Sequence, residues 1–213
     1  MKRLNIKTKM ITTNEILKKN ENPHFIGAWN IENNDLCTEI INFFEENRDL
    51  QRDGVTGSGK NLTIKKTTDI VVNANDLKNI KFKCLNKYIN ELYKNFRDYQ
   101  NQWPFLKSLI KEVHIGKFNI QKYSPGGHFA KIHTERSSIV SSHRLFAWMT
   151  YLNNVEDGGA TNFSHYDIKI KPETGKTLIW PAEWTHAHNG EILNSGVKYI
   201  VTGWMHFPHD VNK

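Results

Sequence analysis

Hydrophobic residues in the first half of the chain recur at the three- and four-residue spacing of amphipathic helices. The first such run follows a potential N-cap at Asn34-Asp35, predicts a helix over about 35–47, and comprises Leu36, Ile40, Phe43 and Phe44. A second helix is indicated by a longer run of Leu77, Ile80, Cys84, Tyr88, Leu92 and Phe96. Pro104 is expected to start or end the element that follows.

From about residue 113 onward, the pattern changes to short β-branched and aromatic runs divided by turn signals. These turns contain glycine or proline, as at Gly126-Gly127, Asp157-Gly158-Gly159, Pro172, Gly175, Pro181, Gly190 and Gly196. Many short strands at this spacing predict a barrel or a double-sheet jelly roll with the helices packed outside it. The expected fold class is therefore α+β.

The length of 213 residues fits one domain better than two. Residues 1–24 are polar and rich in lysine and asparagine, so we expect a loosely held N-terminal arm followed by a single domain over 25–213. The stretch 52–60 has three glycines in six residues and no apolar periodicity, which predicts a flexible loop. Such a loop could cover an active site or simply connect two elements.

The net charge of +7 raises the question of a nucleic-acid partner. Residues 78–111 hold eight Lys/Arg against Glu91 and Asp98, and their helical spacing favours a solvated helix face over a polyanion-binding patch. The two cysteines, Cys37 and Cys84, are expected to be buried thiols. Because no stretch approaches the ~20 apolar residues of a membrane span, we expect no membrane contact and a reducing, cytoplasmic location.

Candidate metal ligands occur at two places in the strand-rich half. His133 and Glu135 are two residues apart, and in a strand such side chains point to the same face. His186 and His188 lie in a later segment, and either could add the third ligand. Two histidines and one carboxylate form the facial triad of non-haem Fe(II) oxygenases; zinc is the chemical competitor, although the helical zinc-peptidase motifs are absent.

The last predicted strand carries a lysine that needs explanation. Lys198, Ile200, Thr202 and Trp204 share one face, and Val197, Tyr199 and Val201 share the other. A strand that is apolar on both faces is buried, and a buried ammonium requires an anionic partner. The alternative is a lysine at the strand end whose charge reaches water.

These residues together resemble the 2-oxoglutarate/Fe(II) dioxygenases of the prolyl 4-hydroxylase-like group, including phage or viral members. The resemblance covers about 120–207 and consists of Tyr123, His133-x-Glu135, Arg144, Tyr151-Leu152-Asn153, Gly158-Gly159-x-Thr161-x-Phe163, Pro172-x-x-Gly175, His188-x-Gly190, Gly196-x-Lys198 and Trp204-x-His206. It implies a double-stranded β-helix (jelly roll) core with N-terminal supporting helices. The family usually has His-x-Asp, so Glu135 is a departure that lengthens the ligand by one methylene.

The resemblance also implies site roles. It selects His188 as the third iron ligand beside His133 and Glu135, because the family's 2-oxoglutarate-binding basic residue follows ten positions later, at Lys198; His186 becomes supporting. Further residues are assigned by the same resemblance: Tyr123, Tyr151 and Thr202 to the cosubstrate pocket, and Arg144, Trp204 and His206 to the substrate groove. Core packing and a surface ion pair are the alternatives for Tyr123, Tyr151, Trp204 and Arg144.

The implied cofactors are Fe(II), 2-oxoglutarate and O2, with ascorbate as a reductant. The implied activity is hydroxylation of prolyl residues in a peptide or protein, by a monomer in the cytoplasm of a cell or of a viral host. Three alternatives remain open: a nucleic-acid base hydroxylase or demethylase, a jelly-roll binding module without catalysis, and an enzyme acting on free amino acids or other small molecules.

Overall fold

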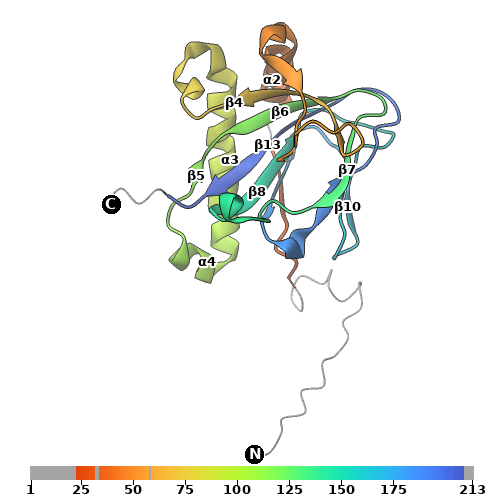
Figure 1. The fold of residues 1–213 in the computed structure, drawn as a ribbon. Coiled ribbons are helices and arrows are strands. Elements are labelled where there is room, and N and C mark those ends of the chain that lie inside the picture. The colour runs from red at the N-terminus through yellow and green to blue at the C-terminus, as the bar shows by residue number, and fades with distance from the viewer. Residues whose placement is uncertain (1–22, 32–33, 58, 209–213) are drawn as a thin grey trace, which may run out of the picture.

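Two antiparallel sheets dominate the computed structural model, which describes residues 23–31, 34–57 and 59–208 (Figure 1). The larger sheet has eight strands in the order β1 (Gly27–Asn30), β11 (Lys176–Pro181), β8 (Arg144–Tyr151), β13 (Lys198–His206), β6 (Phe118–Tyr123), β4 (Thr68–Val72) and β2 (Gln51–Asp53), with β5 (His114–Ile115) beside β13. The smaller sheet has the order β10 (Ile168–Ile170), β9 (Thr161–Phe163), β12 (His188–Gly190), β7 (His128–His133) and β3 (Lys65–Lys66). This is the predicted double-sheet jelly roll.

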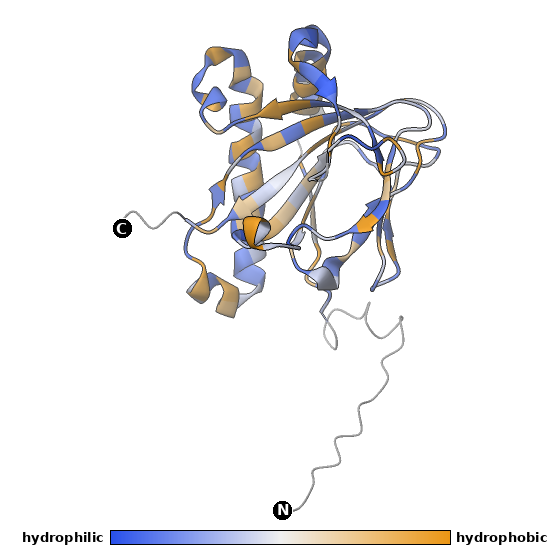
Figure 2. Cartoon of the chain, viewed as in Figure 1, coloured by the Kyte–Doolittle hydropathy of each residue, from blue (hydrophilic) through white to orange (hydrophobic). Residues whose placement is uncertain are grey.

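Helices cover one face of the larger sheet (Figure 1). They are α2 (Asn34–Glu46), α3 (Lys83–Gln102) and α4 (Pro104–Leu109), and short 3-10 turns occupy Arg48–Leu50, Asp76–Lys78, Ile80–Phe82, Ile139–Ser141 and Trp184–His186. The hydropathy colouring of Figure 2 shows α3 with alternating hydrophilic and hydrophobic residues, as expected of a helix with one buried side. The α+β class is thus observed.

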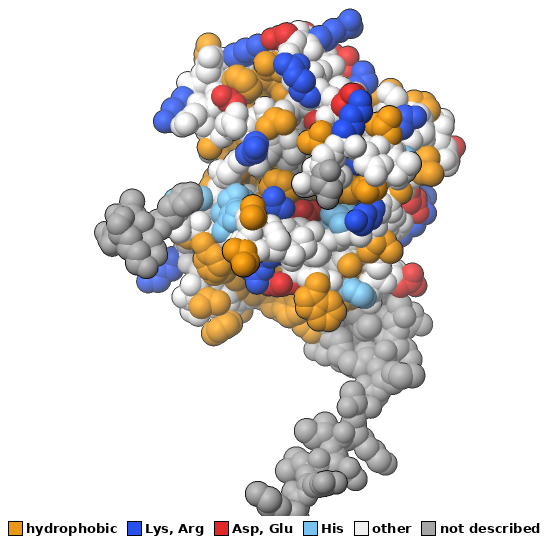
Figure 3. All heavy atoms as spheres, viewed as in Figure 1, with side chains coloured by type: hydrophobic (Ala, Val, Ile, Leu, Met, Phe, Trp, Pro, Cys, Tyr) orange, Lys and Arg blue, Asp and Glu red, His pale blue; other side chains and the backbone are white. Residues whose placement is uncertain are grey.

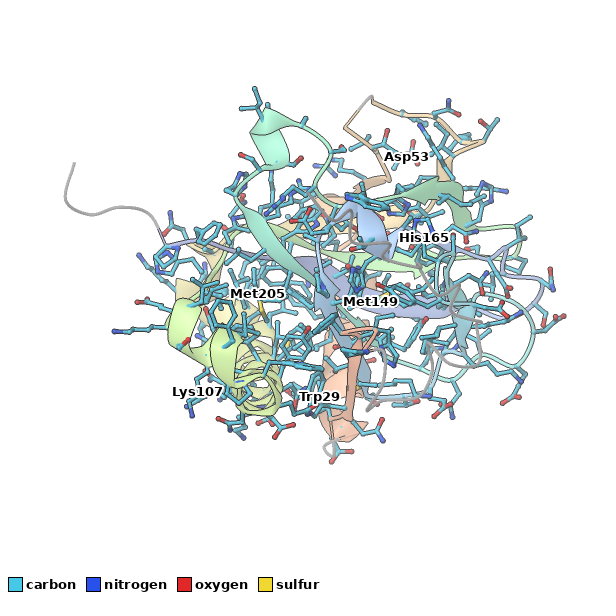
Figure 4. All side chains as sticks on the ribbon, turned by 90° about the horizontal axis from the view of Figure 1, so that it is seen from below. Trp29, Asp53, Lys107, Met149, His165 and Met205 are labelled. Atoms are coloured by element: carbon cyan, nitrogen blue, oxygen red, sulfur yellow. The ribbon has the colours of Figure 1, made fainter. Side chains whose placement is uncertain are left out.

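The alternation of side chains along the strands divides the core into two clusters. On β8, Phe146 and Trp148 face the helices, whereas Met149 and Tyr151 face the space between the two sheets. Met205 of β13 lies on the helix side of the larger sheet. In Figure 4 it is labelled closer to the helices than Met149 is. The space between the sheets is the interior into which the candidate site residues project.

The N-terminal half differs from the sequence prediction in two ways. The predicted helix that included Leu77 and Ile80 begins only at Lys83, because both residues lie in 3-10 turns before it, and it continues to Gln102. This half also supplies β1, β2, β3 and β4 to the sheets, although helical support alone was expected. Their short length gave the pattern little periodicity to detect.

The stretch 52–60, predicted as a loop, is partly ordered into sheet. Arg52 and Asp53 belong to β2, which pairs with β4. Gly54 donates its backbone N–H to the carbonyl of Thr67 at 2.9 Å, so the beginning of the stretch is tied to the larger sheet. That the stretch 52–60 covers the site stays a prediction.

Other expectations concern the N-terminal arm, the cysteines and the helices. The predicted arm lies outside the described residues, except for Pro23 and His24. Both cysteines are free thiols; Cys37 is buried and Cys84 is half-buried. In the described part of the chain, no helix combines the length and apolarity needed to cross a membrane.

Candidate metal and cosubstrate site

His133, Glu135 and His188 converge at one end of the smaller sheet. His133 ends β7 and His188 begins the neighbouring β12, where the two residues are paired in register. Oε1 of Glu135 lies 3.3 Å from Nε2 of His188 and 3.6 Å from Nε2 of His133. The three potential ligand atoms are all within 4.8 Å of one another, and they are the only such group found among the described residues. One metal ion could contact all three.

The period-two argument assumed that Glu135 and His133 share a strand, but the structure places Glu135 beyond the end of that strand. β7 ends at His133, and the next residue, Thr134, donates its hydroxyl to the carbonyl of Ala182, just after β11, at 2.9 Å. The carboxylate nevertheless reaches the two imidazoles.

Backbone carbonyls fix the orientation of both imidazoles. Nδ1 of His133 lies 2.9 Å from the carbonyl oxygen of Lys131, and Nδ1 of His188 lies 2.8 Å from that of His186. Because a carbonyl oxygen can only accept, each Nδ1 carries a proton, so Nε2 is the ring nitrogen left to bind a metal. This is the second contact that metal-binding histidines usually have.

The electrostatics of Glu135 suit a cation. Burial by itself would raise the pKa of Glu135, but in the absence of a metal the hydrogen bonds and the positive charge of His133 and His188 in their protonated forms lower it well below its ordinary value. The carboxylate is therefore ionised at neutral pH. Two imidazole nitrogens and one carboxylate match the ligand preferences of ferrous iron.

His186 is directed away from this group. Its Nε2 contacts the carbonyl oxygen of His24 at 2.8 Å, and its Nδ1 contacts the hydroxyl of Thr185 at 3.0 Å. Its side chain thus links the Trp184–His186 turn to the N-terminal segment, while its backbone orients His188.

Lys198 is buried at the start of β13, with an exposure of 3%. Its Nζ donates to the carbonyl of Gly159 at 2.7 Å and lies 4.1 Å from the ring centre of Tyr123. Within the described residues, no carboxylate forms an ion pair with it. Burial lowers the pKa of Lys198 to about 8, against the opposing effect of the Glu191 charge. A buried cation that contacts a carbonyl and an aromatic face but no carboxylate is suited to an incoming anion.

The other residues assigned to the cosubstrate pocket lie on neighbouring strands or on β13 itself, and of these Tyr123 contacts Lys198. Tyr123 is opposite Lys198 in the β6–β13 register, and its hydroxyl donates to Gln121 at 2.8 Å. The hydroxyl of Tyr151 is bonded to that of Thr161 at 2.6 Å, and Thr202 donates to the carbonyl of Trp148 at 2.9 Å. Burial raises the pKa of both tyrosines, so both stay protonated donors.

Aromatic packing around the histidines was not predicted from the sequence. Phe129 stacks on His133, with ring centres 3.9 Å apart and an interplanar angle of 13°. Phe163 and Trp180 lie beside His188 at 5.6 and 5.1 Å. The alternation of β7 could have identified Phe129, because it is four residues before His133 and hence on the same face.

Of the three residues assigned to the substrate groove, two lie next to Glu135 and the third packs elsewhere. Arg144 stacks its guanidinium 3.6 Å from the ring centre of Trp204, and the indole N–H of Trp204 donates to Oε2 of Glu135 at 2.7 Å. His206 is paired with Arg144 in the β8–β13 register, but its ring packs against His143 at 4.5 Å. Only Trp204 and Arg144 are thus brought directly to Glu135.

The surface beside the site is partly apolar. Figure 3 shows histidine side chains reaching the surface near charged side chains, with hydrophobic side chains around them. Ile139 and Val140, in the turn that follows Glu135, are 92% and 85% exposed, and Trp184, just before His188, is 68% exposed. An apolar ligand portion could be accommodated next to the polar centre.

The positive charge on α3 fits the solvated-face interpretation. Lys87 pairs with Glu39 at 2.9 Å, and Lys94 pairs with Glu91 at 2.6 Å, all on exposed or half-exposed side chains. These ion pairs give the charge excess a local role that needs no polyanion.

Comparisons with known proteins agree with this geometry. Residues 118–206 match the model of the 2OG-Fe(II) oxygenase superfamily. "Probable prolyl 4-hydroxylase 9" of Arabidopsis thaliana is 26% identical over 124 residues, which cover 46% of this chain and 43% of that relative. The chain thus aligns with less than half of the relative's length.

Solved structures show the same fold at low sequence identity. A viral collagen prolyl hydroxylase of Paramecium bursaria Chlorella virus-1, in a complex with 2OG, superposes with a TM-score of 0.62, 18% identity, and coverage of 86% of this chain and 96% of that one. A Pseudomonas putida prolyl-4-hydroxylase gives a TM-score of 0.65 at 14% identity, covering 92% and 97%. Over residues 118–206 the chain is thus similar to the 2OG-Fe(II) oxygenase superfamily, and it has the fold of these prolyl hydroxylases.

Proposed function

We propose that this protein is an Fe(II)- and 2-oxoglutarate-dependent dioxygenase that hydroxylates prolyl residues in a peptide or protein. The observation that carries the proposal is a combination of two features. Two imidazole Nε2 atoms and one carboxylate oxygen face a common point, and Lys198 is buried between the same sheets without an ion-paired carboxylate among the described residues. A metal-binding module without catalysis has no need of the second feature.

Each side chain has a distinct task in this proposal. His133, Glu135 and His188 hold iron, and Lys198 binds the remote carboxylate of 2-oxoglutarate, helped by the protonated hydroxyls nearby. Three protein ligands leave about three positions on a six-coordinate metal, enough for a bidentate 2-oxo acid and O2. When bound, the iron supplies the oxidation chemistry: substrate, O2 and 2-oxoglutarate give hydroxylated substrate, succinate and carbon dioxide.

The choice of a prolyl substrate rests on the relatives and on access to the site. The names of the curated relative and of the similar solved structures are those of prolyl hydroxylases, and one, from Trichoplax adhaerens, is in complex with a hypoxia inducible factor peptide fragment. The side chains of His133 and Glu135 are 19% and 15% exposed, so a peptide can approach them from the surface. Lys198 lies deeper, which supports a cosubstrate bound in the interior and a peptide bound at the surface.

The finer points of the proposal follow the family resemblance. Ascorbate would serve as the reductant that keeps iron ferrous, and residues 25–213 would act as one catalytic unit in a cytoplasmic monomer. Arg144 and His206 would line the peptide groove.

The test is a substrate panel with two readouts. The purified full chain, loaded anaerobically with Fe(II), is given 2-oxoglutarate and air with proline-containing peptides, free proline or single-stranded DNA. We expect peptides alone to stimulate succinate release and to gain one oxygen atom at proline by mass spectrometry. Stimulation by DNA or free proline, without peptide oxidation, would replace the proposed substrate class, and no succinate in any arm would reject the activity.

A further inference from the structure

The two carboxylate oxygens of Glu135 have different partners. Oε1 faces Nε2 of His133 and of His188, at 3.6 and 3.3 Å. Oε2 accepts the indole N–H of Trp204 at 2.7 Å. An indole N–H can only donate, so it pairs with a carboxylate oxygen and fixes which oxygen points away from the histidines.

Glu135 needs such a partner more than a strand residue would. It lies beyond the end of β7, and a glutamate has three side-chain torsions whose ordering costs conformational entropy. Its carboxylate can therefore rotate or withdraw unless another group holds it. Arg144 does not hold the carboxylate by a hydrogen bond, because its Nη1 is 3.8 Å from Oε2 of Glu135, beyond hydrogen-bond distance.

Trp204, in contrast, is on a rigid element. It belongs to the nine-residue β13, paired with Ala147 of β8. The Arg144 guanidinium covers its ring, and Nη1 of Arg144 donates to the backbone carbonyl of Glu135 at 2.9 Å. The indole and the guanidinium thus restrain the side chain and the backbone of Glu135 together.

We infer that Trp204 is a positioning residue that holds Glu135 as a ligand through one oxygen, Oε1, rather than a contact to the substrate. This inference rests on the proposed function and deepens it. With Oε2 engaged by the indole, Glu135 presents a single oxygen to a metal. A glutamate bound through both oxygens would occupy one more position and leave too few for a bidentate cosubstrate and O2.

The variant that tests this is Trp204→Phe, which removes the N–H and retains an aromatic ring beneath Arg144. Co(II) serves as an air-stable probe, and calorimetry measures its affinity and then the affinity of the Co(II) protein for 2-oxoglutarate. The intensity of the Co(II) absorption bands reports the coordination geometry. Trp148→Phe is the matched control: this indole is also on the larger sheet but faces the helices, and its N–H has no acceptor among the described residues.

We expect Trp204→Phe to weaken Co(II) binding or 2-oxoglutarate binding at least about tenfold, as for the loss of one hydrogen bond to a charged group, and to change the Co(II) spectrum. Trp148→Phe is expected to lower thermal stability without altering either affinity or the spectrum. The inference is overturned if both affinities of Trp204→Phe stay within about twofold of wild type, above all if the KM for peptide rises instead. A wild-type protein that binds no Co(II) would refute the proposed metal centre itself, which distinguishes the two failures.

Discussion

Two neighbouring histidines, His186 and His188, are held in different ways, and substitution should separate them. His188→Ala removes an Nε2 that faces Glu135, so we predict a loss of Co(II) affinity of at least about a hundredfold, more than loss of a supporting contact costs. His186→Ala retains the backbone carbonyl that orients His188 and loses the ring contacts with His24 and Thr185. It should keep Co(II) affinity within a few-fold and lose about 1–2 kcal/mol of stability.

Calorimetric metal titration and urea unfolding of both variants provide the measurements. If His186→Ala loses the metal and His188→Ala retains it, the assignment of the third ligand is wrong.

The buried charge of Lys198 predicts a pH-dependent stability. Burial lowers its pKa from the ordinary 10.5 to about 8, so between these values the unfolded chain binds more protons than the folded one. The free energy of unfolding should therefore rise with pH across this window, by at most roughly 3 kcal/mol, as the cost of a buried ammonium disappears.

Urea unfolding of wild type and Lys198→Met, in parallel across that window, isolates this contribution. We expect the difference in stability between the two proteins to shift in favour of wild type as pH increases. A constant difference would contradict the assigned burial of the charge.

At the scale of elements, β13 connects the features of the site. Its alternation directs Lys198 and Trp204 between the sheets and leaves Gly203 facing the helix-side core. A Cβ at Gly203 would lie 2.7 Å from Cβ of Phe118 and 2.8 Å from Cζ2 of Trp148. We predict that Gly203→Ala destabilises the protein by about 1–3 kcal/mol through overpacking.

Thermal unfolding measures this effect, and Gly196→Ala provides a contrast. Gly196 has no neighbour within 4 Å of an added Cβ, although its φ of +73° disfavours alanine for a different reason, backbone strain. Because the crowding at Gly203 pushes β13 itself, Gly203→Ala should also weaken 2-oxoglutarate binding, whereas Gly196→Ala should affect stability alone. An unchanged melting temperature in Gly203→Ala would show that the sheet relaxes freely there.

The sequence predicts those elements whose periodicity is sustained. The face shared by Lys198, Ile200, Thr202 and Trp204 is observed, as is the helix over about 35–47. The helix start at Lys83 was missed because Leu77 and Ile80 continue the apolar spacing through two 3-10 turns. Likewise, nothing in the chain order reveals that Trp204 bonds to Glu135, 69 residues earlier, since side-chain partners depend on how strands pair in space.

At the scale of the whole molecule, each of the two sheets contributes different residues to the site. The smaller sheet presents His133 and His188, the larger sheet presents Lys198 and Trp204, and Glu135 follows the end of β7 in the smaller sheet. The α3 side of the larger sheet carries a separate hydrophobic core that keeps these strands in place. A site built between rigid sheets is pre-organised for its ligands.

The central claim is that the buried ammonium of Lys198 binds the cosubstrate while the triad binds the metal. The most direct measurement compares wild type with Lys198→Ala for iron content and for succinate formation against 2-oxoglutarate concentration. Lys94→Ala is the control, since Lys94 is exposed and pairs with Glu91 on α3. We predict normal iron content and at least about a tenfold higher requirement for 2-oxoglutarate in Lys198→Ala, because a charge-assisted pair is lost. An unchanged 2-oxoglutarate dependence in Lys198→Ala would contradict the account.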